Sequence, residues 1–573
     1  MKVRKRVALL ASAAVVALVA AACGGSDETP GGEGQTRSGG TLIYGFETPF
    51  MENWFPSIAA GNSVATAYAI IRVLPSPTKY TPTFEVVPDL ELLTEAPKSE
   101  MLNGKQVVTY KLNPAAVWSD GDPLDAKDFK YSWEVQRSSD PEKDGCPDLL
   151  STTGYDQVAS VEGSDNDKTV KVTFATPYSD WLSLYNQQLF PAHIMDKPTP
   201  AEDCATIKKG WPVKDGVPVS AGPWKIEAAN VDVSKKIATL TVNERYWGKK
   251  PNLDRLVYQN IGNVPGTNVK ALKSGEVGMI YPQPQVDLVT EIKALEPQIT
   301  SKTSFGLSFE HLDMNTRNVH LKDINVRKAI ATALDRPSLV AATVGQFDNR
   351  AQVLNNRFYV NNQKEYADNS ADGYTKGDVA KAKTMLEGAG YTLGSDGIYT
   401  KAGAGKLSLE LMTTQNNPLR ENTVDIIASQ LKGVGIEIKK FLNADIFAGR
   451  EKPKSLEAGG FDLALFAWVS SPFVAGNVSI YKSATAAAPG QNYVLGNNPK
   501  VDDALASMTQ QTVPAEQAAL ANEADTLLWA DMFTLPLYQK PTFLAYNSDY
   551  TGVAENSTNS SPMWNSEGFA KKT

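Results

Sequence analysis

Apolar residues recur along this chain with two different periods, which predict strands and helices in alternation. Runs with a period of two, rich in β-branched and aromatic residues, predict strands over 41–46, 107–112, 237–242, 256–259, 278–281, 407–412, 436–441, 461–469 and 535–538. Apolar residues three and four positions apart predict helices after Asp125, before Gly275, after Asp323, over 379–388 and 422–432, near Ile446 and over 515–530. The alternation is most regular in the second half, which favours an α/β fold with a substantial sheet.

The first 22 residues have the layout of a secretory signal peptide. Residues 1–6 are basic, residues 7–19 are apolar and uncharged, and three alanines precede Cys23. The apolar stretch is shorter than the roughly 20 residues that a bilayer span needs. Residues 20–23 resemble a bacterial lipobox, although Ala20 stands where Leu is usual. We therefore expect Cys23 to carry lipid that anchors the protein to the cell membrane, at the cell surface or in the periplasm. The alternative is ordinary leader cleavage, with Cys23 incidental.

Residues 23–38 predict a flexible tether. They are mainly Gly, Ser, Asp, Glu, Thr and Pro, without a large apolar residue, and such a stretch cannot bury enough surface to fold. The folded body is expected to begin at Gly39.

Charge and cysteine content narrow the class of protein. The net charge is −8, and it becomes −12 when the four basic residues of the leader are removed. A negative surface repels nucleic acid phosphates, so no nucleic acid partner is expected. Besides Cys23, the chain has Cys146 and Cys204, an even pair in an exported chain. They predict a disulfide, and the alternative is two free thiols.

Catalytic and metal-binding motifs are absent from the sequence. The three histidines are scattered, no Cys-x-x-Cys or His-x-x-x-His spacing offers a zinc site, and there is no Gly-x-Ser-x-Gly elbow or phosphate-binding glycine loop. We therefore expect no metal, no cofactor and no enzymatic activity. A large exported body without catalytic groups is more typical of a binding protein.

Five segments in order resemble motifs of the bacterial extracellular solute-binding proteins of family 5, the peptide and nickel class that serves ABC importers. They are WSDGDPLDAKDF (118–129), NERYWGKKP (243–251), DINVRKAI with LDR (323–336), AKTMLEGAGY (382–391) and FDLALFAW (461–468). Most aromatic residues of these motifs are expected to support the fold rather than contact a ligand.

The resemblance implies a two-lobe periplasmic-binding-protein-like fold of the α/β class, hinged by two chain crossings. We expect lobe I over 39–302 with an inserted subdomain at about 52–190, lobe II over 303–530, and a return to lobe I over 531–573. Ligand would be enclosed between the lobes by hinge closure.

The same resemblance suggests where ligand would bind. Trp468 matches an aromatic residue at the mouth of lobe II, and the alternative is a core tryptophan. The backbone of Ala467, Val469, Ser470 and Ser471 could pair with an extended peptide. Further candidate contacts are Glu310 and His311 near the first crossing, Tyr538 near the return, and Phe46 and Glu47 on the opposite wall.

One departure from the family bears on specificity. Ser471 stands where oligopeptide binders place an aspartate that neutralises the peptide's amino terminus, and a buried ammonium without a counter-ion is costly. Either another acid serves, such as Glu47 or Glu310, or the ligand has no free amine there. An oligopeptide is the first expectation. The alternatives are an oligosaccharide or other nonpeptide solute, or a peptide-sensing surface lipoprotein. The expected partners are ABC permease subunits, and the chain is expected to be a monomer.

Overall fold

The computed structural model describes residues 36–48, 50, 52–262, 264, 266–370, 374–485 and 490–573. The predicted signal peptide, the lipidation of Cys23 and most of the tether lie outside the described residues. At the end of the predicted tether, Thr36–Arg37 forms strand β1, which pairs with β23 (Ala570–Lys572). Hydrogen bonds to the C-terminal strand thus order the chain before Gly39.

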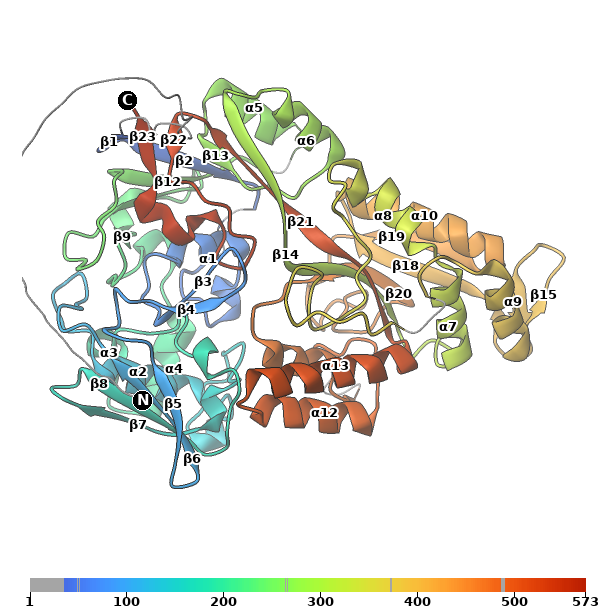
Figure 1. Ribbon diagram of the computed structural model, residues 1–573, viewed down its shortest axis with the longest axis horizontal. Coiled ribbons are helices and arrows are strands. Elements are labelled where there is room, and N and C mark those ends of the chain that lie inside the picture. The colour runs from blue at the N-terminus through green and yellow to red at the C-terminus, as the bar shows by residue number, and fades with distance from the viewer. Residues whose placement is uncertain are drawn as a thin grey trace, which may run out of the picture.

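One sheet of eleven strands runs through both halves of the molecule (Figure 1). Its order is β10-β11-β12-β2-β13-β21-β14-β20-β18-β19, and β9 also pairs with β11. The strands are β2 (Thr41–Phe46), β9 (Trp224–Lys225), β10 (Val231–Asp232), β11 (Ile237–Val242), β12 (Arg255–Asn260), β13 (Met279–Ile280), β14 (Ile299–Met314), β18 (Ser408–Thr414), β19 (Glu437–Asn443), β20 (Leu463–Trp468) and β21 (Thr534–Asn547).

The two lobes are joined by β14 and β21, the longest strands of the sheet. These strands are antiparallel and pair from Ile299 with Asn547 to Asp313 with Thr534. The strands of lobe I join this ribbon where β13 pairs with β21, and the strands of lobe II join it where β20 pairs with β14. The predicted α/β fold of two lobes with two crossings is confirmed. The crossings are strands of the shared sheet rather than loops.

Helices from both lobes share a core on one face of this sheet. Lobe I contributes α5 (Thr267–Ser274) and α6 (Val286–Lys293), and lobe II contributes α7 (Ile324–Ala333), α8 (Arg336–Ala342), α9 (Val379–Gly388) and α10 (Pro418–Val434). A second core cluster lies in lobe I, and a third lies in lobe II and also includes Phe84 of lobe I. Lobe I also has α1 (Val64–Ile70), and lobe II has α11 (Val478–Tyr481), α12 (Pro499–Gln510) and α13 (Pro514–Asp531) around a further cluster.

The remaining elements are short or belong to the inserted part of lobe I. The range predicted for that part, about 52–190, contains β3 (Thr78–Tyr80), β4 (Val86–Pro88), β5 (Lys98–Leu102), β6 (Lys105–Lys111), β7 (Val158–Ser164), β8 (Thr169–Phe174) and α2 (Ala126–Gln136). Helices α3 (Ala192–Met195) and α4 (Pro200–Lys209) follow it. Strands β5, β6, β8 and β7 form a four-stranded antiparallel sheet. The short strands elsewhere are β15 (Thr392–Leu393), β16 (Tyr399–Lys401), β17 (Gly405–Lys406) and β22 (Tyr550–Thr551).

The segment around Trp118 starts helix α2. Asp125 caps the helix, and a reciprocal capping box joins it to Asp128. The fully buried Trp118 donates from Nε1 to the Asp128 carboxylate at 3.2 Å. This segment therefore has a structural role, as expected for most of the family motifs.

The helix predicted near Ile446 is wrong. Residues 444–447 form turns instead, because Asn443 Oδ1 accepts a hydrogen bond from the backbone of Asp445, and Ile446 packs beside Leu456 in the lobe II core. The chain turns here to place an apolar side chain rather than to continue a helix.

The structure joins Cys146 and Cys204 in a disulfide across 58 residues, with their Cα atoms 5.1 Å apart. Cys204 belongs to α4, so the bond fastens this helix to the loop that follows α2.

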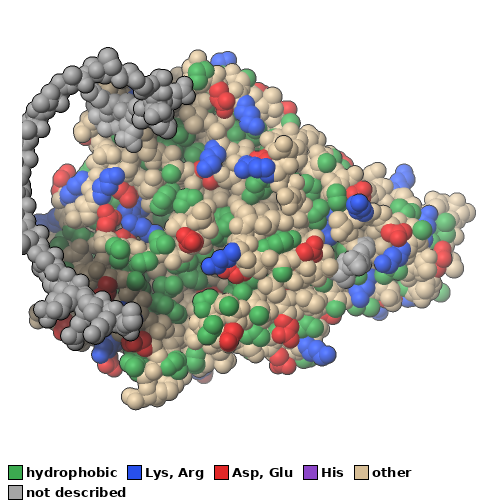
Figure 2. Space-filling view, viewed as in Figure 1, with side chains coloured by type: hydrophobic (Ala, Val, Ile, Leu, Met, Phe, Trp, Pro, Cys, Tyr) green, Lys and Arg blue, Asp and Glu red, His purple; other side chains and the backbone are tan. Residues whose placement is uncertain are grey.

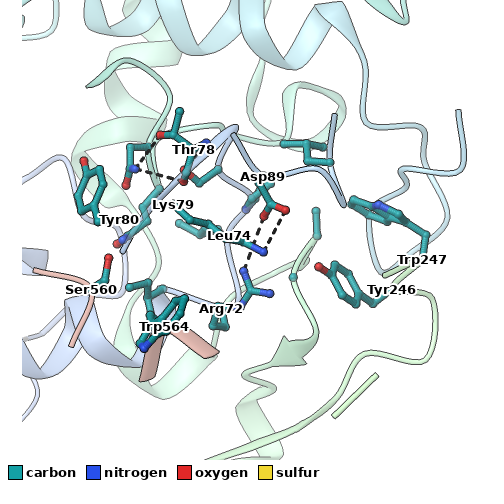
Figure 3. Close-up of a pocket in the computed structure, with 18 residues that line it drawn as sticks. Arg72, Leu74, Thr78, Lys79, Tyr80, Asp89, Tyr246, Trp247, Ser560 and Trp564 are labelled. Carbon is teal, nitrogen blue, oxygen red and sulfur yellow. Dashed lines mark hydrogen bonds and ion pairs between the residues drawn. The ribbon is translucent and has the colours of Figure 1, made fainter. Parts of the chain in front are cut away.

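Buried charges fix the base of the inserted part to lobe I (Figure 3). Arg72 forms two hydrogen bonds with Glu567, at 2.9 and 3.0 Å, and Lys79 lies 3.0 Å from Asp89. The small cavity among these residues is lined by Arg72, Lys79 and Asp89. The ion pairs and hydrogen bonds make this cluster a structural junction.

Glu91 extends this junction. The Tyr246 hydroxyl donates to its carboxylate at 2.6 Å, and the Lys249 backbone donates at 2.8 Å. Although burial alone would raise it, these hydrogen bonds and two nearby cations lower the pKa of the Glu91 carboxyl to about 2. A lowered pKa means that the stabilisation is present above the unfolded value near 4.3 and is lost as the pH falls toward 2.

We expect Glu91→Gln to lower the free energy of unfolding at pH 7 by about 1–2 kcal/mol, after allowance for solvent screening, and by roughly half as much at pH 3. Urea unfolding of both proteins at the two pH values measures the difference. Glu100→Gln, an exposed substitution on β5, is the control. An equal loss at both pH values would contradict the assignment.

Basic and acidic side chains are intermixed on the face drawn in Figure 2, with hydrophobic side chains between them.

Within the described part of the chain, none of the helices has both the length and the apolar character needed to cross a bilayer.

Candidate functional site

The carboxyl ends of strands from both lobes point toward the middle of the β14–β21 ribbon. In lobe I, β2 and β13 are parallel to each other, and β13 is antiparallel to β21. In lobe II, β18 and β20 are parallel, and β20 ends where Trp468 pairs with Phe309 of β14. Ligands of open α/β sheets bind outside the carboxyl ends of the strands. The candidate site is therefore the crevice between these two sets of strand ends.

Trp468 ends β20 inside a group of aromatic rings. Its ring is parallel within 6° to that of His311, with centroids 5.6 Å apart, and it is stacked at 5.7 Å on Tyr493. The residue is only 9% exposed, and its Nε1 has no hydrogen-bond partner among the described groups. Phe84 of the inserted part joins the same cluster, so lobe I helps to cover Trp468.

The backbone beside Trp468 is free along one edge. Strand β18 pairs with β20 only over Leu463–Leu465, whereas β14 pairs with β20 as far as Trp468. Ala467 therefore has a ladder partner, Glu310, on one side alone within the described residues. An extended peptide can add to such an edge. The next residue, Val469, is 67% exposed, and the Ser471 hydroxyl forms a local turn with Phe473.

Glu310 and His311 lie on opposite faces of β14, because successive strand residues point to opposite sides. His311 contacts the rings of Phe466 and Trp468, and neither of its ring nitrogens has a hydrogen-bond partner among the described groups. Glu310 instead binds Arg420 of α10 at 2.8 and 3.0 Å. The structure therefore does not bring these two neighbours to the same wall.

The charge of Glu310 is already neutralised. Burial alone would raise the pKa of its carboxyl, but Arg420 and Lys540 hold that pKa below its usual value. Burial, reinforced by repulsion from Arg420, lowers the pKa of the Lys540 ammonium to about 8. The idea that Glu310 neutralises a peptide amine is thus a poor fit to its surroundings.

Two further candidates are core residues. Tyr538 has no exposed surface and belongs to the helix-covered core, near Glu310. The ring of Phe46 lies in the lobe I core, 4.8 Å from Phe50 and 6.4 Å from Tyr258. Their side chains support the site from behind rather than forming its wall.

Glu47 lines a cavity of about 790 Å³ between the lobes. From lobe I the cavity is bordered by Glu47 after β2, Asn268 of α5 and Gln283 after β13, and from lobe II by Asn416 and Glu421 near the start of α10. Burial raises the pKa of the Glu47 carboxyl, although Asn268 donates a hydrogen bond to it at 2.6 Å. Trp468 does not border this cavity.

The lobes touch through a second set of contacts, made by the inserted part. The Asp180 carboxylate accepts hydrogen bonds from the Ala475 backbone and from Gln517 Nε2, both at 2.7 Å. Tyr80 and Phe473 meet edge to face at 5.8 Å. The structure therefore has its lobes closed upon each other beside Trp468.

We expect Asp180→Ala to favour the open arrangement. The closed arrangement of the variant lacks two hydrogen bonds to a carboxylate, each worth about 1.5–3 kcal/mol. The radius of gyration from small-angle X-ray scattering should increase, and solute affinity should fall by about tenfold. Glu162→Ala, exposed on β7, is the matched control. An unchanged scattering profile would show that Asp180 does not hold the lobes together.

Several residues of the crevice carry no sequence signal. Four of them are ordinary polar residues of loops or helix starts: Asn268, Gln283, Asn416 and Glu421. The fifth, Tyr493, lies in none of the family motifs. Only the rule that ligands bind at strand ends could have suggested Gln283 and Asn416. In the described residues, no group of three or more His, Cys, Asp or Glu side chains is placed to hold a metal ion.

A closed crevice between two lobes that share one sheet defines a solute-binding protein of the periplasmic binding class. The model for bacterial extracellular solute-binding proteins, family 5 (middle part), matches residues 91–490, and the chain belongs to this family. The predicted family is confirmed. Its members bind solutes for ABC transporters and are not enzymes as a class.

Curated relatives support the same assignment. The oligopeptide-binding protein OppA of Mycobacterium tuberculosis is 28% identical over 537 residues, which cover 91% of this chain and 84% of that protein. The oligopeptide-binding protein AppA of Bacillus subtilis is 27% identical over 417 residues, covering 72% of this chain and 71% of the relative.

Among solved structures, the periplasmic EDTA-binding protein EppA has a TM-score of 0.84 at 27% identity and covers 94% of this chain and 98% of its own. The structure of AppA from Bacillus subtilis with a nonapeptide has a TM-score of 0.75 at 22% identity, covering 94% and 100%, and it shows the shared fold.

Proposed function

We propose that this protein is an extracytoplasmic, lipid-anchored binding protein that captures an oligopeptide between its lobes and delivers it to an ABC permease. The observation that carries the peptide assignment is the free edge of β20 at Phe466–Trp468, in a crevice that both lobes enclose. Main-chain pairing to that edge tolerates many side chains, as a peptide carrier requires. The relatives OppA and AppA, which bind oligopeptides, support the same solute class.

Of the candidate contacts, Trp468, Ala467, Val469, Ser470 and Ser471 form the proposed wall of lobe II, and Glu47 belongs to that of lobe I. Glu310, His311, Tyr538 and Phe46 are proposed to support these walls. The aromatic surface of Trp468 offers a peptide apolar area.

Native mass spectrometry of the protein purified without its leader tests the solute class. Co-purified ligands whose masses differ by amino-acid residues are expected. Masses that differ by hexose units would overturn the peptide assignment.

A nonpeptide solute is the second candidate, because Ser471 gives the β20 loop no acid for a peptide amine. Its support among relatives is the similarity to the EDTA-binding protein EppA. The probable monoacyl phosphatidylinositol tetramannoside-binding protein LpqW of Mycobacterium tuberculosis is also 24% identical over 425 residues, covering 68% of this chain and 61% of its own. A single co-purified mass without residue spacing would favour this candidate.

The anchor and the transport role have separate tests. Metabolic labelling with palmitate should mark the wild-type chain and not Cys23→Ser. Deletion of the gene should abolish growth on the identified peptide as sole nitrogen source. Normal growth with loss of a transcriptional response to the peptide would favour the alternative of a peptide-sensing lipoprotein. In solution we expect a monomer.

A further inference from the structure

Four carboxylates are among the described residues that line the 790 Å³ cavity between the lobes. Glu47, Asp287 and Glu291 come from lobe I, and Glu421 comes from α10 of lobe II. The other described residues of the lining are apolar residues, glycine and neutral amides, with no Lys or Arg among them. The nearby Arg420 faces away toward Glu310, to which it is bound.

Asn268 is an independent sign that this cavity takes a hydrogen-bond donor. The residue is 5% exposed, and its Nδ2 donates to Glu47 at 2.6 Å. An ionised carboxylate only accepts hydrogen bonds, so Glu47 fixes the orientation of the amide and leaves Oδ1 as an acceptor. That buried Oδ1 has no partner among the described groups. Buried acceptors are rarely left without a donor.

We propose that this cavity binds an ammonium group of the solute, with Glu47 and Asn268 as its direct partners and Glu421 closing from the other lobe. The inference rests on the peptide-binding function proposed above. An ammonium carries three N–H donors and a positive charge, which match an unpaired amide oxygen and neighbouring carboxylates. The two other positions considered for this role do not serve it, because residue 471 is a serine and Glu310 is occupied by Arg420 and Lys540.

The placement also links the ammonium to closure of the lobes. Closure brings Glu421 toward the three acids of lobe I, and like charges repel. A cation between these acids attracts the carboxylates of both lobes. It therefore binds the closed arrangement more tightly than the open one. A ligand shifts a conformational equilibrium only through such a difference in affinity.

The test uses three pools of synthetic pentapeptides of random sequence. One pool has free amino termini and lacks Lys and Arg, the second is the same but N-acetylated, and the third is N-acetylated with one Lys per peptide. Native mass spectrometry measures the bound fraction for each pool. The wild-type protein should bind the first or the third pool about tenfold more than the second, and the difference between those two identifies the source of the ammonium.

Glu47→Gln should reduce this preference to about twofold or less while the protein still binds peptides, and Glu421→Gln should weaken it in the same direction. Glu100→Gln, exposed on the inserted part, controls for the change in net charge and should behave like wild type. Equal binding of all three pools by the wild type, or an undiminished preference in Glu47→Gln, would overturn the inference alone. Binding of none of the pools would instead overturn the proposed peptide function and the inference with it.

Discussion

Trp468→Ala is expected to weaken solute binding and to lower the free energy of unfolding at the same time. The side chain is 9% exposed and touches the rings of His311, Phe466 and Tyr493. Removing such a buried ring leaves a cavity, which costs about 3–5 kcal/mol. Loss of its aromatic area should also lower solute affinity by about tenfold or more. Urea unfolding and calorimetric titration with the co-purified solute measure the two effects.

Phe447→Ala is the matched control for Trp468. Phe447 contacts Phe466 of the same cluster but is 53% exposed, so its loss should cost about 1 kcal/mol or less. Trp468→Phe should retain part of both properties. Unchanged solute affinity in folded Trp468→Ala would remove the residue from the site and leave it a core tryptophan.

Asp525→Ala should destabilise lobe II by about 3–5 kcal/mol, because it leaves a buried guanidinium without its counter-ion. Arg357 and Asp525 are 2.8 Å apart, and neither side chain is exposed. Arg357 also donates to the carbonyl of Thr534, the first residue of β21, so the pair ties α13 to the start of the return strand. Thermal and urea unfolding of the variant measure the loss.

Glu523→Ala on the same helix is the control for Asp525, since it removes an exposed carboxylate and should change the stability by about 0.5 kcal/mol or less. The double variant Asp525→Leu with Arg357→Met should recover much of the loss, because buried ion pairs can be replaced by apolar residues. A single variant as stable as Glu523→Ala would show that the pair contributes nothing.

Strands and helices whose ends are marked by nearby residues in the sequence were predicted correctly. Strands 41–46 and 237–242 and helix 379–388 agree with the structure to the residue, because alternation or capping defines each of them locally. The helix start predicted at Asp323 is also observed, with Asp323 as its N-cap.

The ribbon that joins the lobes was largely missed. β14 was not predicted, because its first half mixes polar residues with Gly306 and owes its extended form to pairing with β21. Only residues 535–538 of β21 were predicted as strand, since Pro536 and Pro541 argue against a central strand. Both prolines lie at irregular points of the register, opposite His311 and Phe305, where a missing N–H disturbs the ladder least.

The candidate site was predicted in part for a similar reason. Trp468 was predicted from the family resemblance and Glu47 from its place after the predicted strand 41–46, and both border the space between the lobes. Glu310 and His311 were each predicted as ligand contacts near the first crossing, although adjacent residues of a strand face opposite ways. Asn268 and Glu421 come from different lobes, and only the fold brings them around one cavity.

Because both lobes share one sheet, the protein cannot readily be divided into two independent halves. β14 and β21 are inner strands for both halves, so either half produced alone would expose a long unpaired edge, which invites aggregation. Chimaeras made by exchanging whole halves between homologues are therefore a poor route to new cargo. Grafting the short loops that follow β2, β13, β18 and β20 leaves the backbone ladder intact and alters only the surface that meets the cargo.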